Sequence, residues 1–373
     1  MTRYAGMLGL HFIQPLFCVS VFCLLYVSTC GLILPSFLLT GIISTCYWVI
    51  RNASARRRID TQGKYILITG CDTGFGNSLA RLLDSKGLKV FATCLSEQSE
   101  GAKLLRKNGS KQMRVLQLDV SSDASVDACF DKIKPICLKD GLWALVNNAG
   151  IMGKGDVEIQ SMDTYKKIAE VNLFGVVRMC KAFLPLVRQC KGRVINVTSV
   201  RGLQAYCADS GYVMSKFALE GFTDCLRLEM RRFGVKVIHV EPGMFGLSTG
   251  LFNDENVERY KDLNKKLIDN VGDEIRAAYG QEYLDTYMRL PKMRPGSSDK
   301  DLKAVLDAFE DAILSHRPDS RYLVDGKVFD GDCMMARLRN ILPVFIMDPL
   351  YFYLRPLPKE AFYSCTTSGQ RRN

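Results

Sequence analysis

Six short apolar segments, separated by helix-like stretches, constrain the fold more strongly than any other feature of the sequence. They are rich in Val, Ile and Leu without strict alternation of polar and apolar residues, which is typical of strands buried on both faces of a parallel sheet. The repeated alternation predicts a doubly wound, Rossmann-like α/β fold with right-handed crossovers. The segments are YILIT (65–69), KVFATC (89–94), RVLQLDV (114–120), LWALVNN (142–148), GRVINVTS (192–199) and VKVIHVEP (235–242), with RYLVDG (321–326) as a candidate seventh strand.

The rest of the 373-residue chain divides into further predicted parts. Residues 1–58 are a predicted membrane anchor, and residues 59–330 the catalytic domain. Within that domain, residues 253–300 are charged and helix-prone, so we interpret them as a helical insertion over the active-site end. Residues 331–373 form a predicted C-terminal helical extension, in which residues 332–358 are dense in Met, Phe, Tyr and Leu. Two interpretations of it stay open: ordinary core packing, or an apolar lid or membrane-associated segment.

The N-terminal segment carries no charged side chain from Ala5 to Ile50, with His11 counted as neutral. Such a run exceeds the roughly 7–15 residues of a signal-peptide core, and it suffices for two spans of about 20 residues. Arg3 and the arginines at 56–58 flank it, and positive residues near membrane ends favour the cytoplasm. We therefore predict two spans in the endoplasmic reticulum, with a cytosolic catalytic domain. A re-entrant hairpin, a single tilted span, a mitochondrial transit peptide and location in a mitochondrial membrane are the alternatives.

The charge and cysteine content argue against nucleic-acid binding and against a metal site. The net charge of +11 forms no basic stripe, so nucleic-acid binding is not expected, whereas contact with an anionic membrane face is. The chain has 14 Cys but no CxxC pair, and only three His, so we expect no metal site. The thiols are interpreted as buried or idle in a reducing compartment.

A glycine-rich stretch, TGCDTGFG (69–76), directly follows the first predicted strand and precedes a helix. Its glycines are Gly70, Gly74 and Gly76. In this setting the backbone N–H groups can approach a pyrophosphate, whose charge the helix N-terminus favours. The stretch therefore predicts a dinucleotide-binding loop.

Ser199, Tyr212 and Lys216 are spaced as a catalytic unit would be. Hydride transfer from an alcohol needs a base for the hydroxyl proton, but a free tyrosine has a pKa near 10. Lys216 lies four residues after Tyr212, on the same face of a helix, and a nearby cation favours the phenolate. We therefore expect Lys216 to lower the pKa of Tyr212. Tyr206 is interpreted as a pocket wall or packing residue, and His239, in an apolar strand, as structural.

Four more motifs complete a resemblance: LDV (118–120), NNAG (147–150), VNLFG (171–175) and EPG (241–243). In this order and spacing, the chain from about residue 64 to 355 resembles the short-chain dehydrogenase/reductase family. It is most similar to a branch with membrane-associated members that act on D-β-hydroxybutyrate, 17β-hydroxysteroids and retinol. The resemblance implies an NAD(P)-dependent oxidoreductase acting on CH–OH groups, and it allows a homo-oligomer.

The resemblance also implies roles for individual residues. Tyr212 would be the acid/base, Ser199 would bind and polarise the substrate oxygen, and Lys216 would also contact the nicotinamide ribose. Asn172 would join a proton relay through water. The implied cofactor-binding residues are Gly70, Asp72, Gly74, Phe75, Gly76, Asp119, Asn147, Gly150, Tyr212, Lys216, Pro242, Gly243 and Thr249, the last left open against Ser248.

The choice between NAD and NADP depends on the end of the second strand, which meets the adenine ribose. The residues there, Cys94 and Leu95, are neither acidic nor basic. Asp72 lies in the glycine loop, where NADP-dependent members of the family often carry a basic residue. Because a carboxylate repels a 2′-phosphate, we predict NAD rather than NADP.

Three hypotheses about the function stay open, two of which differ in the substrate. The apolar terminal segments favour a lipophilic secondary alcohol of the hydroxysteroid or retinoid type, or its ketone. The family resemblance also allows D-3-hydroxybutyrate, for which Arg201, just after Ser199, is a candidate partner if it does not simply face solvent. The third possibility is an inactive membrane-bound scaffold that retains the fold, which the intact Ser199, Tyr212, Lys216 and Asn172 disfavour.

Overall fold

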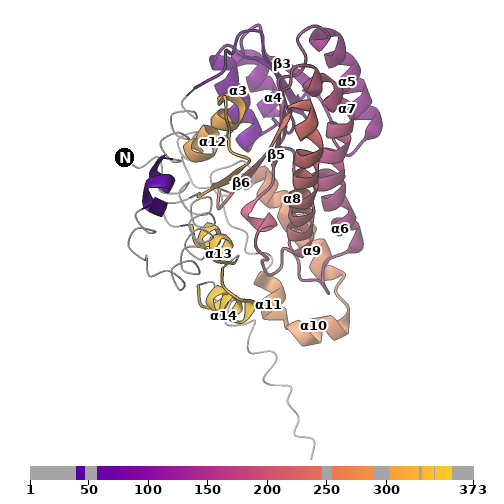
Figure 1. Ribbon diagram of the computed structural model, residues 1–373. Coiled ribbons are helices and arrows are strands. Elements are labelled where there is room, and N and C mark those ends of the chain that lie inside the picture. Colours follow the sequence, from indigo (N-terminus) through magenta and orange to yellow (C-terminus); the bar gives the residue numbers. More distant parts are fainter. Residues whose placement is uncertain are drawn as a thin grey trace, which may run out of the picture.

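A seven-stranded, fully parallel sheet with the order β3-β2-β1-β4-β5-β6-β7 forms the centre of the computed structural model (Figure 1). The structure describes residues 39–46, 57–245, 254–286, 288, 302–326, 330–339 and 341–354. The strands are β1 (Tyr65–Ile68), β2 (Lys89–Cys94), β3 (Arg114–Gln117), β4 (Ala144–Asn147), β5 (Arg193–Val197), β6 (Lys236–Pro242) and β7 (Arg321–Val324). The predicted Rossmann-like fold is confirmed.

Helices cover both faces of the sheet (Figure 1). The helices on one face are α3 (Gly74–Ser85), α4 (Glu100–Asn108) and α12 (Lys303–Leu314), and those on the other are α5 (Asp123–Cys137), α7 (Gly175–Gln189) and α8 (Ser210–Met230). Successive strand residues point to opposite faces, so Ile66 and Ile68 join the first core and Leu67 the second. Both faces are therefore apolar, which explains the lack of polar alternation in the sequence.

The strand order reverses between β1 and β4, which are neighbours in the sheet. In open α/β sheets, ligands bind outside the carboxyl ends of the strands at such a switch point. The glycine-rich stretch follows β1 and the NNAG motif follows β4, so the fold brings these two motifs together.

Two helical groups are added to this domain. The first interrupts the chain after β6, and its Ile268 and Leu284 pack with Ile159 from the segment between β4 and α6. The second follows β7, and its Cys333 packs against Val200, just after β5. The helices of the two groups are α9 (Asp254–Asp269), α10 (Asp273–Tyr279), α11 (Gln281–Thr286), α13 (Gly331–Arg339) and α14 (Val344–Leu354), whereas α6 (Met162–Ala169) lies between β4 and α7. Figure 1 shows α9, α10, α11, α13 and α14 gathered at one end of the domain.

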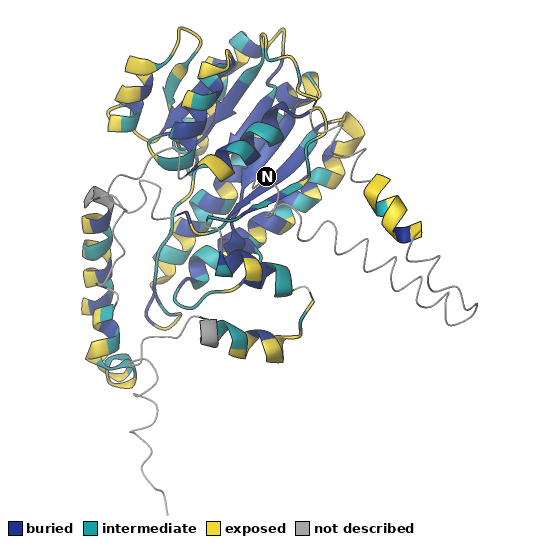
Figure 2. Ribbon diagram, turned by 90° about the vertical axis from the view of Figure 1, so that its left-hand side faces the viewer, coloured by how far each residue is buried: buried dark blue, intermediate teal, exposed yellow. Residues whose placement is uncertain are grey.

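The predicted anchor falls largely on residues 1–38 and 47–56, which lie outside the described residues. Of the helices that the structure describes, none combines the length and the hydropathy needed to cross a bilayer. The described helix at 39–46 exposes Leu39, Ile42 and Ile43, whereas buried residues elsewhere concentrate in the sheet and on the helix faces that cover it (Figure 2).

Candidate active site

The turn from β1 into α3 leaves no room for a side chain at Gly70 or at Gly76. Gly70 and Gly74 have φ angles of +69° and +61°, in the left-handed region that favours glycine. A Cβ on Gly70 would lie 2.8 Å from Ala149 Cα, and one on Gly76 would lie 2.4 Å from the Gly70 carbonyl oxygen. The loop is therefore a backbone cradle at a helix N-terminus, which fits the pyrophosphate of a dinucleotide.

Asn148, directly after β4 in the NNAG motif, braces this loop. Its Nδ2 donates to the carbonyl oxygens of Thr69 (2.8 Å) and Gly70 (3.0 Å), and its backbone N–H donates to Thr69 Oγ1 (2.9 Å). Asn147, a predicted cofactor-binding residue, is buried and donates to Asn196 Oδ1 (2.8 Å). The doubled asparagine of NNAG was the only signal for this brace in the sequence.

A carboxylate lies at the end of β2 although the strand itself contributes none. Asp72, from the glycine loop, accepts hydrogen bonds from the backbone N–H groups of Leu95 (2.9 Å) and Ser96 (3.4 Å). Asp119, after β3, accepts from the N–H of Ser121 (2.9 Å). Asp72 thus places a negative charge where an acidic residue of β2 would otherwise meet the adenine ribose.

Some of the remaining predicted cofactor-binding residues lie within the described part of the chain, and some lie outside it. The Phe75 ring packs edge-on against Phe245 at 5.6 Å, so this residue offers the cradle its backbone rather than its ring. Pro242 is the last residue of β6, and Gly243 follows it. Ser248 and Thr249 lie outside the described residues.

The structure brings Ser199, Tyr212 and Lys216 together at the carboxyl end of β5. Tyr212 lies in the first turn of α8, and Lys216 Nζ is 5.6 Å from the centre of its ring. Lys216 is buried and donates to the Val197 carbonyl oxygen (2.8 Å), at the end of β5. Ser199, two residues beyond β5, makes a side-chain hydrogen bond with Tyr212.

Asn172 joins this group through a π-helical turn, η1 (Glu170–Phe174), inserted between α6 and α7. Such turns are frequent at functional sites. Its Oδ1 accepts from the Ile151 N–H (2.8 Å), and its Nδ2 donates to the Ile151 carbonyl oxygen (2.9 Å) and to Ser215 Oγ (3.0 Å). Ser215 Oγ in turn donates to the Tyr212 carbonyl oxygen (2.7 Å). Ser215 was missed in the sequence, where nothing distinguishes it.

The electrostatics of the pair differ from expectation. Burial raises the pKa of Tyr212 to about 12, although the hydrogen bond with Ser199 opposes the shift. Burial also lowers the pKa of Lys216 to about 8, opposed by the charge of Glu220. The expected lowering of the Tyr212 pKa by Lys216 is therefore wrong for the chain alone, because the same burial disfavours the phenolate and the ammonium.

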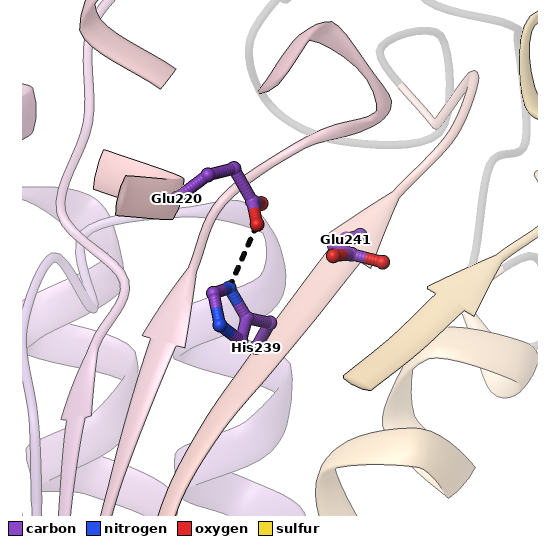
Figure 3. Close-up of side chains that lie close together, drawn as sticks. All are labelled: Glu220, His239 and Glu241. Atoms are coloured by element: carbon purple, nitrogen blue, oxygen red, sulfur yellow. Dashed lines mark ion pairs between the residues drawn. The ribbon is translucent and has the colours of Figure 1, made fainter. Parts of the chain in front are cut away.

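A buried ionic cluster lies one helical turn beyond Lys216 (Figure 3). His239 of β6 contacts two carboxylates of α8, with Nδ1 2.9 Å from Glu220 and Nε2 3.1 Å from Asp224. Arg321 of β7 contacts both of these and also Glu241, at 2.5 to 2.7 Å. His239 therefore bridges two carboxylates of α8 from β6.

Charge compensation sets the pKa values within the cluster. Burial alone would raise the pKa of Glu220, but His239 and Arg321 hold it below its usual value. Burial and the neighbouring Glu220 raise the pKa of Glu241 to about 7. Glu220, His239 and Glu241 each present a ligand atom within 4.8 Å of the others, as a metal site would. Arg321 already supplies the cation between the two glutamates.

A second ionic cluster lies on the other side of Ser199. Arg201 is buried rather than solvent-facing, with Nη2 3.2 Å from Asp332 of α13 and Nε 3.9 Å from Asp209. Its guanidinium lies 3.7 Å from the centre of the Tyr206 ring. Tyr206 packs edge-on against Tyr351 of α14 at 5.8 Å. The C-terminal extension therefore contacts the segment between Ser199 and Tyr212.

Comparisons with known proteins agree with this geometry. Residues 64–259 match the protein family described as short chain dehydrogenase. The mitochondrial D-beta-hydroxybutyrate dehydrogenase of Mus musculus is 43% identical over 73% of this chain and 80% of its own length. Retinol dehydrogenase 16 of Rattus norvegicus is 38% identical, covering 80% and 91% of the two chains. The 17-beta-hydroxysteroid dehydrogenase type 6 of Bos taurus is 37% identical, covering 84% and 96%.

A solved structure supports the fold alone. It is a short chain dehydrogenase/reductase from Burkholderia phymatum in complex with NAD, which superposes with a TM-score of 0.58. The match covers 76% of this chain and 94% of that one at 23% sequence identity.

Proposed function

The chain belongs to the short-chain dehydrogenase family, and we propose that it is an NAD-dependent oxidoreductase that interconverts a lipophilic alcohol of the hydroxysteroid or retinoid type and its carbonyl compound. Its relatives are dehydrogenases that act on CH–OH groups. One observation carries the proposal. Ser199, Tyr212, Lys216 and Asn172 converge within hydrogen-bonding networks at the carboxyl end of β5.

In the proposed mechanism, Ser199 holds the substrate oxygen and Tyr212 exchanges the proton with it. Bound NAD supplies the hydride acceptor in oxidation, and its reduced form the hydride donor in reduction. With a pKa of about 12, Tyr212 is protonated at neutral pH and is poised to act as the acid. Alcohol oxidation needs the phenolate, so we expect it to accelerate as the pH rises. Asn172 holds the Ile151 carbonyl for a water relay to Lys216.

The cofactor preference rests on Asp72. Its carboxylate accepts hydrogen bonds at the end of β2, so a 2′-phosphate bound there would meet a like charge. We therefore expect NADH to bind at least about tenfold more tightly than NADPH, the effect of one unfavourable charge contact of about 1.4 kcal/mol.

The preference for a lipophilic substrate has two supports. The retinol and 17-beta-hydroxysteroid dehydrogenases named above match this chain over more than nine-tenths of their length. Helix α14 exposes Val344 and Phe345, and the helix at 39–46 exposes Leu39 and Ile42, which suits a catalytic domain resting on a membrane. A bilayer, of the endoplasmic reticulum or of mitochondria, would then deliver the substrate.

The second candidate is D-3-hydroxybutyrate dehydrogenase, because relatives with that name reach 43–44% identity. A substrate panel on the detergent-solubilised full chain, run with NAD and with NADP, separates the two. We expect turnover of hydroxysteroids or retinol with NAD. Turnover of 3-hydroxybutyrate alone would contradict the lipophilic substrate, and NADH binding without turnover of any alcohol would indicate an inactive scaffold.

A further inference from the structure

One arginine beside the substrate-binding serine is shared by two buried carboxylates. Arg201 lies between Asp209, which directly precedes α8, and Asp332 of α13, and all three side chains are buried. The Tyr206 ring covers the guanidinium at 3.7 Å. One guanidinium thus faces two carboxylates within the cluster, and the charge of Lys154 also acts on Asp209.

This cluster borders the reacting groups. The backbone N–H of Arg201 donates to Ser199 Oγ (3.1 Å), the oxygen that we assign to substrate binding. The charges of Asp209 and Arg201 both act on Tyr212, in opposite directions. A charged group on a substrate bound at Ser199 and Tyr212 would therefore interact with the same cluster.

We propose that Asp332 determines substrate specificity: by occupying Arg201, it excludes substrates that carry a carboxylate close to the reacting hydroxyl. This inference rests on the proposed function and deepens it, because it assigns uncharged alcohols to the site. A free guanidinium binds carboxylates in paired, charge-assisted hydrogen bonds. Here the guanidinium is already ion-paired with Asp332 and lies near Asp209, so a substrate carboxylate would be a third acid beside it.

The opposing interpretation is that Arg201 itself binds the substrate carboxylate. Its Nη1 makes no hydrogen bond to any residue in the described part of the chain, so one N–H group remains for such a contact. The two interpretations predict opposite effects. If Arg201 binds the substrate, its removal weakens carboxylate binding to the wild-type protein. If Asp332 blocks it, removal of the acid creates carboxylate binding that depends on Arg201.

The experiment measures the binding of butyrate and of butyramide, its uncharged isostere, to the NADH-loaded full chain in detergent. We expect the wild-type protein to prefer butyramide. In Asp332→Asn, butyrate affinity should rise at least about tenfold relative to butyramide, because the freed guanidinium gains a charge partner. Adding Arg201→Met to Asp332→Asn should remove the gain. Asp209→Asn, which frees the same guanidinium from another element, should shift the ratio in the same direction.

Asp325→Asn is the matched control. Asp325 pairs with Arg337 of α13 at 3.0 Å, so this variant loosens the same helix without touching Arg201, and its ratio should stay at the wild-type value. Thermal melting of each variant identifies any that fail to fold. An unchanged ratio in folded Asp332→Asn or Asp209→Asn, including absence of butyrate binding, overturns the inference, as does loss of existing butyrate binding in Arg201→Met alone.

Turnover assays on the same proteins keep the two proposals apart. Turnover of 3-hydroxybutyrate should rise in Asp332→Asn relative to that of the best uncharged alcohol. A shift in ligand preference without turnover of any alcohol would contradict the proposed function and leave the role of Asp332 supported. Turnover of uncharged alcohols without any shift would do the reverse.

Discussion

At the carboxyl edge of the sheet, the loops after β1 and β4 make their contacts with backbone atoms and short polar side chains, whereas the region after β5 and around α8 buries ionisable groups. The first region brings Gly76 against the Gly70 carbonyl and braces the loop through Asn148. The second encloses Lys216 and Glu220 within the core. Close steric fit of the backbone determines the first region, and buried ionisable side chains determine the second.

This difference has energetic consequences. A backbone cradle has no ionisable group of its own, so its defects should appear as weaker cofactor binding with little pH dependence. Buried charges are costly unless they are paired, so defects in the second region should change proton transfer, stability or their dependence on pH. Substitutions confined to one region test whether the two are separable.

The largest expected effect is that of Tyr212→Phe, which removes the proton donor and keeps the ring. We expect alcohol turnover to fall by about 1,000-fold or more, the loss typical of a missing acid/base group. The Kd for NADH should stay within about threefold of wild type, because the cradle is built from other residues. Steady-state kinetics and fluorescence titration with NADH measure both. Turnover near the wild-type rate would contradict the assignment of Tyr212 as the acid/base.

Gly76→Ala should disrupt the glycine loop, the first of the two regions. The added methyl group would lie 2.4 Å from the Gly70 carbonyl oxygen, which belongs to the backbone and yields little. We expect the Kd for NADH to rise by up to about 100-fold, in line with the overpacking of a tight site. The pH dependence of turnover at saturating cofactor should keep its shape.

Gly221→Ala is the control for this prediction. Gly221 lies on α8, in the charged region, and a Cβ there would meet no atom within 4 Å. Its Kd for NADH should match that of wild type. Equal weakening in both variants would mean that the two regions are not separable.

The same division explains what could be predicted from the sequence. KVFATC predicted β2 with its correct bounds, and the spacing of Tyr212 and Lys216 predicted a shared helix face, because both patterns are local. Asn147 and Asn148 show the limit. Neighbouring residues at the end of a strand point in different directions, and the sequence does not say which of them faces the loop.

The contacts between charged residues could not be predicted from the sequence for a different reason. Arg201 looked like a solvent-facing loop residue, and its partner Asp332 follows more than a hundred residues later on a separate helix. The bridge from Glu220 through His239 likewise needs α8 and β6 side by side. Such pairs depend on tertiary packing, which no short pattern encodes.

The smallest expected effect is a change in stability when the buried lysine of the charged region is replaced. The pKa of Lys216 is about 8 in the fold against 10.5 ordinarily, because burial disfavours the ammonium. Between these values the unfolded chain holds a proton that the folded chain has released, so wild-type stability rises with pH across this window. Below pH 8 the fold bears the cost of the buried charge. Lys216→Met should therefore be more stable than wild type at pH 7, by about 2 kcal/mol after loss of the bond to Val197.

Urea unfolding of the full chain at pH 7, 8, 9 and 10 tests this prediction, and the advantage of Lys216→Met should shrink steadily from pH 8 upward. Lys103→Met is the control. Lys103 lies on the surface of α4 and pairs with Glu100, so its replacement should change stability by less than about 0.5 kcal/mol at every pH. If Lys216→Met were less stable than wild type at pH 7, with a gap independent of pH, the ammonium would be stabilised by its surroundings. The charged region would then hold its charges without strain, and the energetic contrast with the glycine loop would fail.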